Sequence, residues 1–202
     1  MSNRKPENQT TYYQKHSPKC IAAFRVVSAQ LGNLEFDGHG FSGKYPDGLI
    51  EDPNIVFAVT CQCGSTVHKI VAKSKYHEIW QHQNLVVAER FFLVCSSCHS
   101  RHLLFDRFTH GYDAETSQLE GWPLSEIIGS DQPLPVKEVV TCECSNCHNT
   151  TFEVFTRFEY PSDLFDESLF RGREQEFFSW FTGVGKCNNC SRLNVFMDYE
   201  CA

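Results

Sequence analysis

Several features that would place a chain in a membrane or outside the cell are missing from this sequence. No stretch approaches the run of about eighteen apolar residues that a membrane-spanning helix needs. Met1–Lys19 is polar throughout, so we expect neither a signal peptide nor export. We therefore expect a cytoplasmic protein, with no membrane partner, whose thiols stay reduced.

Common catalytic signatures are also absent. The sequence contains no Gly-x-Ser-x-Gly nucleophile turn, no Walker phosphate-binding loop and no His-Glu-x-x-His zinc motif. The His-x-Glu and Pro-Cys-x-x-Cys signature of the zinc nucleobase deaminases is missing as well. We therefore predict no catalytic residues and no organic cofactor, and we expect that the protein is not an enzyme.

Methionine is scarce, whereas phenylalanine is abundant. The 202 residues include two Met and seventeen Phe. Rigid aromatic rings pack well against pleated, half-buried surfaces, so this balance favours β-rich layers. The length is sufficient for one domain, or for two small ones that each have a core.

Basic residues are few in the second part of the chain. Residues 1–110 carry twelve Lys or Arg and nine Asp or Glu, a net charge of +3, whereas residues 111–202 carry six and sixteen, a net charge of −10. The second part would repel nucleic acid, so only the first part is a candidate to bind it. The acidic second part favours a protein partner with a basic surface.

Cysteine is the residue that this sequence has in excess. Disulfide scaffolds are typical of exported chains with an even number of cysteines, but this chain has eleven, which favours metal binding. Two closely spaced thiolates can turn inward from one tight turn, and two such turns complete a tetrahedron around zinc. We therefore predict two structural zinc ions. The predicted ligands are Cys61, Cys63, Cys95 and Cys98 for the first, and Cys144, Cys147, Cys187 and Cys190 for the second.

The assignment of Cys142 has two solutions. The segment Val59–Cys63 resembles Val140–Cys144, and this alignment would make Cys142 a ligand in place of Cys147. Turn geometry favours Cys147 instead, because two intervening residues let both sulfurs converge from one turn. We choose turn geometry and predict that Cys142 is a spare thiol beside the site.

Four further residues are weighed against simpler roles. His68 and His99 lie nearest the first cysteine set, and a histidine could replace one of its ligands, but an ordinary surface histidine is the simpler interpretation. Cys20 and Cys201 are expected to fill apolar positions, because free cysteine is among the most buried residue types.

The two cysteine sets belong to a repeated pattern. Ser100-Arg101 and Ser191-Arg192 follow the closing pairs, and each leads into an apolar run that contains an acid. We interpret this as an internal duplication of a strand–turn–strand unit. Both copies resemble the zinc-ribbon fold group, in which two cysteine turns at hairpin tips share one zinc. The resemblance covers roughly Ile55–Phe108 and Val136–Glu200, and it implies a fold without identifying an activity.

The pattern of strands predicts a β-rich, small α+β fold of two tandem zinc ribbons with short helical inserts and an N-terminal strand region. We expect the inserts at Ser74–His82 and from Ser162 onward. The predicted division is an N-terminal arm and strand region over residues 1–53 that packs on the first ribbon, the first ribbon over 54–110, an acidic Pro/Gly linker over 111–135, and the second ribbon over 136–202.

These observations predict a non-catalytic zinc-binding protein that acts through protein–protein interaction as an adaptor, an inhibitor or a small subunit. One alternative is a nucleic-acid-binding protein that uses the basic N-terminal half. Its candidate contacts are Lys69, Lys73, Lys75, Tyr76, Trp80, Arg101 and Arg107. The second alternative is a metal or redox enzyme, which would need a solvent-exposed, reactive Cys142 or an open position on a metal.

Overall fold

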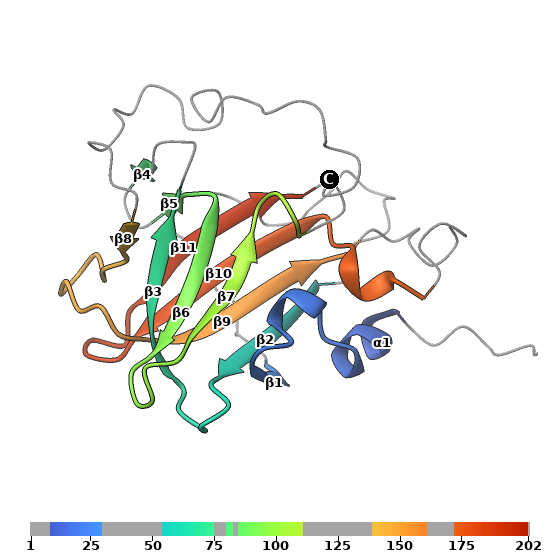
Figure 1. Cartoon of the computed structure of the whole chain (residues 1–202), viewed down its shortest axis with the longest axis horizontal. Helices are drawn as coiled ribbons and strands as arrows, with labels where there is room; N and C mark the ends of the chain where they lie inside the picture. Colours follow the sequence, from blue (N-terminus) through green and yellow to red (C-terminus); the bar gives the residue numbers. More distant parts are fainter. Residues whose placement is uncertain are drawn as a thin grey trace, which may run out of the picture.

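The structure is a computed structural model, and it describes residues 9–29, 54–74, 80–82, 85–110, 139–160 and 172–201. Strands dominate these residues and pair antiparallel in one large curled sheet (Figure 1), which confirms the β-rich fold class. No described helix is long and apolar enough to cross a membrane.

Two units of four strands build most of the sheet. The first unit contains β2 (Asn54–Thr60), β3 (Val67–Lys73), β6 (Arg90–Cys95) and β7 (Arg101–Asp106). The second contains β8 (Val139–Thr141), β9 (Phe152–Glu159), β10 (Trp180–Cys187) and β11 (Leu193–Glu200). The remaining elements are α1 (Gln9–Lys15), the 3-10 helices η1 (Lys19–Ile21) and η4 (Glu174–Glu176), strand β1 (Arg25–Ser28), and the small hairpin of β4 (Trp80–His82) and β5 (Leu85–Val87).

The first strand of each unit pairs with the other unit. Strand β2 lies along β9, with Val59 opposite Val154, while β8 lies along β3, with Thr141 opposite Val71. Strands β3 and β9 also pair where they begin. The sheet therefore has two arms that branch from this point: β1-β2-β9-β10-β11 and β8-β3-β6-β7.

The exchange of strands follows an approximate twofold symmetry centred on the pair His68–Phe152. In this symmetry Ala58 of the first unit corresponds to Thr141 of the second, and Phe155 of the second unit corresponds to Val71 of the first. The pair Ala58–Phe155 therefore has an equivalent in the pair Thr141–Val71. The register of β6–β7 shifts at Phe91/Phe92, and that of β10–β11 shifts at the equivalent Gly183/Val184. The structure thus contains two copies of one unit, and each copy completes the sheet of the other.

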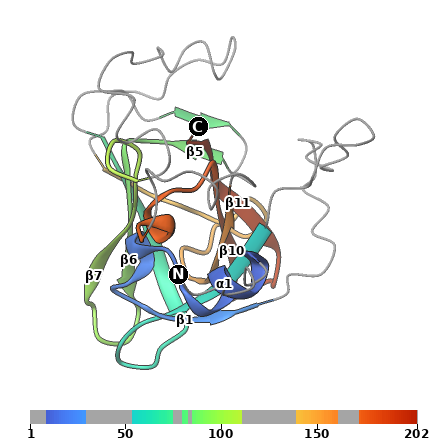
Figure 2. The same cartoon turned by 90° about the vertical axis from the view of Figure 1, so that its right-hand side faces the viewer.

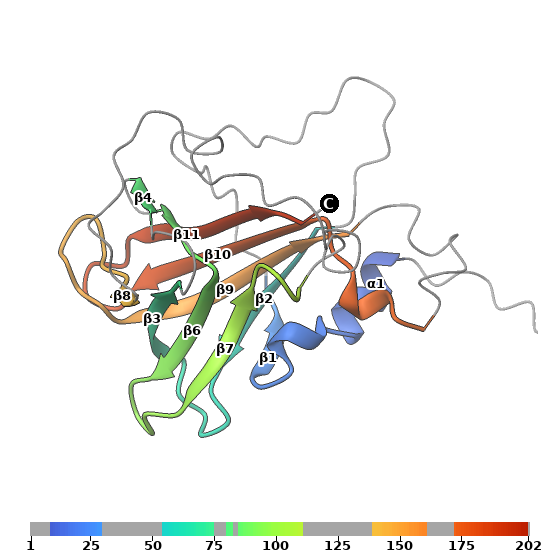
Figure 3. The ribbon, with the colours of Figure 1, turned by 45° about the horizontal axis from the view of Figure 1, so that its top comes forward.

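Aromatic side chains fill the space between the two arms. The rings of Phe105 on β7 and Phe181 on β10 stack with their centroids 4.3 Å apart. Tyr199 on β11 packs against Phe105 and places its hydroxyl 2.8 Å from the backbone N of Ala88. Figures 2 and 3 show the β6–β7 hairpin on one side of this core and the β10–β11 hairpin on the other.

The N-terminal segment contacts both units. The ring of Tyr13 on α1 stacks on Tyr160, which follows β9, with a centroid distance of 3.4 Å. Phe24 is buried and meets His102 on β7 edge to face, with centroids 5.6 Å apart. This segment therefore closes one end of the core that the two units share.

One predicted helical insert is wrong where the structure describes it. Trp80–His82 forms strand β4, which pairs with β5, instead of the end of a helix over Ser74–His82. Pairing with a nearby strand provides cross-strand side-chain contacts. The apolar spacing of this short segment gives a helix too little stabilisation to compete with those contacts. The second insert, from Ser162, and the linker over 111–135 lie outside the described residues.

Candidate metal centres

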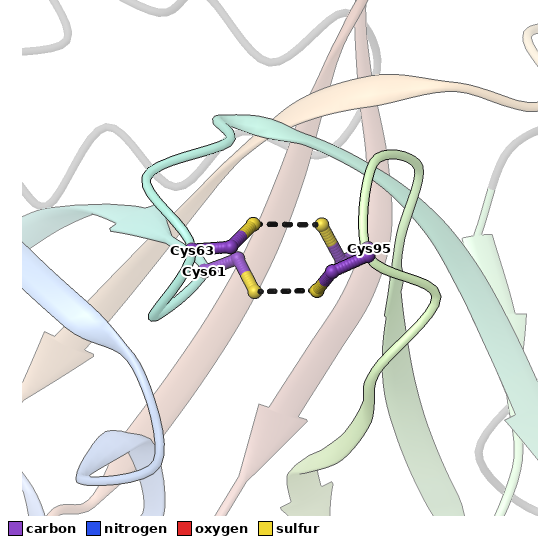
Figure 4. A group of neighbouring side chains, drawn as sticks. Cys61, Cys63 and Cys95 are labelled. Atoms are coloured by element: carbon purple, nitrogen blue, oxygen red, sulfur yellow. Dashed lines mark hydrogen bonds between the residues drawn. The ribbon is translucent and has the colours of Figure 1, made fainter.

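The first candidate centre joins two turns of the first unit. Cys61 and Cys63 lie in the turn between β2 and β3, and Cys95 and Cys98 lie at or just after the end of β6. The Sγ atoms of Cys61 and Cys98 are 3.5 Å apart, and those of Cys63 and Cys95 are 3.6 Å apart. Figure 4 shows the side chains converging from the two facing turns.

The second candidate centre repeats this arrangement in the second unit. Cys144 and Cys147 lie between β8 and β9, while Cys187 and Cys190 lie at the tip of the β10–β11 hairpin. The Sγ atoms of Cys144 and Cys190 are 3.6 Å apart, and those of Cys147 and Cys187 are 3.5 Å apart. In each set of four, all sulfurs lie within 4.8 Å of one another.

These distances fit a tetrahedral metal site. Four sulfurs at about 2.3 Å from zinc form a tetrahedron with edges of about 3.8 Å, whereas a disulfide would bring two sulfurs to about 2.05 Å. All eleven cysteines are free thiols. The two four-cysteine groups could therefore hold two metal ions, and soft thiolate ligands favour zinc over hard cations such as magnesium and calcium.

A common backbone conformation shapes the four cysteine turns. The residue after the second cysteine of each pair has positive φ: Gly64 (94°), His99 (60°), His148 (55°) and Ser191 (60°). In the Cys-x-x-Cys turns the first cysteine donates its backbone N–H five residues onward, as from Cys95 to Ser100 O at 2.9 Å. Cys61 donates four residues onward, to Ser65 O, so the Cys-x-Cys turn is one residue shorter and has glycine at the left-handed position.

Hydrogen bonds lower the pKa of two cysteines in each group and so favour their thiolate forms: Cys95 and Cys98 in the first group, and Cys187 and Cys190 in the second. Burial acts to raise the pKa of Cys95, but hydrogen bonds from the N–H groups of Cys98 and Ser97 and from the thiols of Cys63 and Cys98 together lower that pKa to about 6. Cys187 behaves in the same way: burial opposes, and the N–H groups of Cys190 and Asn189 lower its pKa to about 6. Both groups thus contain a ready thiolate, which is the form that binds metal.

Asn194 on β11 supports the second group, and our sequence analysis missed it. Its side chain is 1% exposed. Its Oδ1 accepts hydrogen bonds from the backbone N (3.1 Å) and the hydroxyl (3.2 Å) of Ser145, while its Nδ2 donates to Arg192 O at 3.0 Å and lies 3.7 Å from Cys144 Sγ. These contacts hold the turn that contains Cys144 against the β10–β11 hairpin. Asparagine is common in and near turns for many reasons, so the presence of Asn194 next to this turn does not by itself predict the role.

The three remaining cysteines, Cys20, Cys142 and Cys201, belong to neither group. Cys142 is 1% exposed, and burial raises its pKa to about 12. Its backbone N donates to Ile70 O, which places it where the first unit has Val59. Cys142 therefore lacks the solvent exposure that a redox centre would need. Cys201 is buried, and Cys20 packs against the edge of the core.

The two histidines near the first group do not belong to it. His99 is exposed and occupies the left-handed position of its turn. The expectation that His68 lies on the surface is wrong, because this residue is 1% exposed at the centre of the approximate symmetry. Its Nδ1 lies 3.1 Å from Thr66 O, and burial lowers its pKa.

No protein-family model, curated protein or solved structure matches this chain. The fold and the two four-cysteine groups define a β-rich protein with two candidate metal centres. What these centres do must therefore be argued from the residues themselves.

Proposed function

We propose that this protein is a non-catalytic interaction protein in which each four-cysteine group holds one structural zinc ion. The sulfur–sulfur distances of 3.5 and 3.6 Å support this proposal. A catalytic zinc keeps one position open for water or substrate, whereas four thiolates occupy every position of a tetrahedral ion. The zinc ions would then act on the fold instead of on a substrate.

Each zinc would join a hairpin tip to the turn that follows the first strand of the same unit. The first would connect the β6–β7 tip to the turn between β2 and β3, and both of these strands pair with the other unit. Structural zinc contributes about 10–16 kcal/mol of apparent binding free energy in zinc-finger peptides. Zinc would therefore stabilise the branch point from which both arms extend.

The proposed role is that of an adaptor, an inhibitor or a small subunit in a reducing compartment such as the cytoplasm. Residues 111–202 have a net charge of −10, and a zinc ion bound by four thiolates adds a further −2. This charge favours a protein partner with a basic surface.

Metal content and coordination are measured first. Elemental analysis of protein purified without added metal should find two zinc ions per chain. Cobalt substituted for zinc should give the absorption of a tetrahedral four-thiolate site, and added cyanide should not change it. A spectral change on adding cyanide would reveal an open position and would favour the enzyme alternative.

Partner binding is tested separately with zinc-loaded protein as bait in an extract of the native host. An acidic interaction surface should retain a partner that dissociates as salt is raised from 0.05 to 0.5 M, because charge attraction is screened. Retention that does not depend on salt would contradict the charge argument while leaving the zinc assignment intact.

A further inference from the structure

The outer face of the β3–β6–β7 strands presents a regular array of side chains, which we call the cationic face. Strand pairing aligns its residues in three rows across the strands. The rows are Lys69, Val94 and Arg101; Val71, Phe92 and Leu103; and Lys73, Arg90 and Asp106. The intervening residues Ile70, Leu93 and Phe105 are fully buried in the core, so the array lies on the opposite face of the sheet. Eight of its members are exposed or half-buried, and Asp106 is 4% exposed.

Positive charge on this face is largely unbalanced. Arg90 Nε pairs with Asp106 Oδ2 at 2.7 Å. The guanidinium of Arg101 lies 4.0 Å from the centroid of the Phe92 ring. Within the described part of the chain, neither Lys69 nor Lys73 has an anionic partner. Four cations and one carboxylate thus surround a central row of apolar side chains.

The equivalent face of the second unit serves as an internal comparison. Its rows are Glu153, Lys186 and Leu193; Phe155, Val184 and Val195; and Arg157, Thr182 and Asp198. The central row is again apolar, but the two cations are balanced by two acids. Lys186 pairs with Glu153 at 3.4 Å, and Arg157 pairs with the neighbouring Glu159 at 3.3 Å. This face is also covered, because Val184 and Thr182 are 0% and 2% exposed, whereas the surplus of cations lies on the face whose Lys69, Arg90 and Arg101 meet solvent.

We propose that the cationic face binds single-stranded nucleic acid. Residues two apart along a strand are separated by about 6.6 Å, so the two charged rows flank the Phe92 row on either side at that distance. Proteins that bind single strands combine cations along the backbone with an aromatic ring on which a base stacks, and guanidinium groups can add to this stacking. An acidic peptide would satisfy the charges but would leave the Phe92–Arg101 stack without a planar partner.

This inference goes beyond the proposed protein–protein role and also explains how an acidic protein can bind a polyanion. The net charge of residues 111–202 is −10, but the cationic face belongs entirely to the first unit. Exposed charges separated by more than about 10 Å are largely screened at 0.1 M salt. Glu153 of the second unit lies opposite Val67, next to this face, but it pairs with Lys186 at 3.4 Å. Within the described residues, the unpaired cations of the first unit therefore dominate the local charge.

The test uses zinc-loaded, full-length protein and a fluorescein-labelled 15-nucleotide oligo(U), with fluorescence anisotropy measured from 50 to 300 mM NaCl. Wild type should bind at 50 mM NaCl and lose affinity as salt rises. Each phosphate contact contributes about −0.7 to the slope of log K against log salt for single strands. The double variant Lys69→Gln/Lys73→Gln should therefore make the slope less negative by about 1.4.

A matched control removes the same amount of charge from the equivalent face. Arg157→Gln/Lys186→Gln should leave both affinity and slope unchanged. Phe92→Leu keeps an apolar side chain in the central row but removes the ring, and loss of one stacked base should weaken binding at least about fivefold. Zinc content and urea unfolding are measured for every variant. If Phe92→Leu loses zinc, the two double variants decide the question alone.

Three results would overturn the proposal. The first is no anisotropy change at 50 mM NaCl in protein that holds two zinc ions, which would leave the proposed structural role of zinc intact. The second is equal weakening by the two double variants. The third is competition by polyglutamate as effective as that by unlabelled oligo(U), which would identify an acidic peptide as the occupant.

Discussion

Cys142 tests the ligand assignment and the internal symmetry together. Its side chain is 1% exposed and occupies the position that Val59 has in the first unit. Cys142→Ser places a hydroxyl in this apolar site, and a buried polar group without a hydrogen bond costs about 1–3 kcal/mol. Cys142→Val installs the side chain that the first unit already accepts there. It keeps the site apolar and adds one heavy atom in a shape that the first unit accommodates at the equivalent position, so it should cost less than about 1.5 kcal/mol.

Urea unfolding and elemental analysis measure the two effects separately. Both Cys142 variants should retain two zinc ions, whereas Cys147→Ser should retain one. The free energy of unfolding should fall for Cys142→Ser and change little for Cys142→Val. Loss of one zinc from Cys142→Val would refute the ligand assignment. A valine variant less stable than the serine variant would refute the structural equivalence of Cys142 and Val59.

Three further predictions concern the second unit. Cys190→Ser should hold one zinc and should still unfold in a single urea transition at a lower midpoint, because the two units share their strands; two separate transitions would contradict that sharing. Asn194→Ala should weaken metal retention by the second group about 10- to 100-fold in a chelator competition, as expected when a group that orients a ligand is lost. Unchanged retention would show that Asn194 is dispensable. Gly185→Ala should destabilise the protein by about 1–3 kcal/mol through overpacking. A Cβ there would lie 2.8 Å from the Phe196 ring and 3.0 Å from the Phe152 ring. A urea midpoint equal to that of wild type would show that both rings can move.

The sequence was most informative where chemistry imposes a short spacing. The eight cysteines that were chosen in pairs come together as two sets of four, because each pair lies within one tight turn. In the structure Cys147, and not Cys142, is grouped with Cys144, as turn geometry predicts and as the similarity of Val59–Cys63 to Val140–Cys144 does not. That similarity is offset by two residues from the structural equivalence, in which Val59 corresponds to Cys142. Four identical residues in a five-residue segment can thus mislead when the turns differ in length.

Contacts between distant segments could not be predicted in this way. Alternation along β2 indicates a strand, but nothing in it specifies β9 of the other unit as the partner. His68 is a polar residue whose burial depends on this pairing, because it lies opposite Phe152 at the centre of the exchange. The β4–β5 hairpin likewise depends on a neighbouring strand more than on local propensity.

The exchange of first strands has a consequence for the order in which the chain can fold during synthesis. Val59 and its partner Val154 are 95 residues apart, so at about 5–20 residues per second the ribosome needs roughly 5–20 s to supply the partner strand. The first cysteine set is complete as soon as Cys98 has emerged, before any residue of β9 has been made. A zinc ion bound at that stage would hold the turns of the first unit together while the edge of β2 that later pairs with β9 is still unpaired.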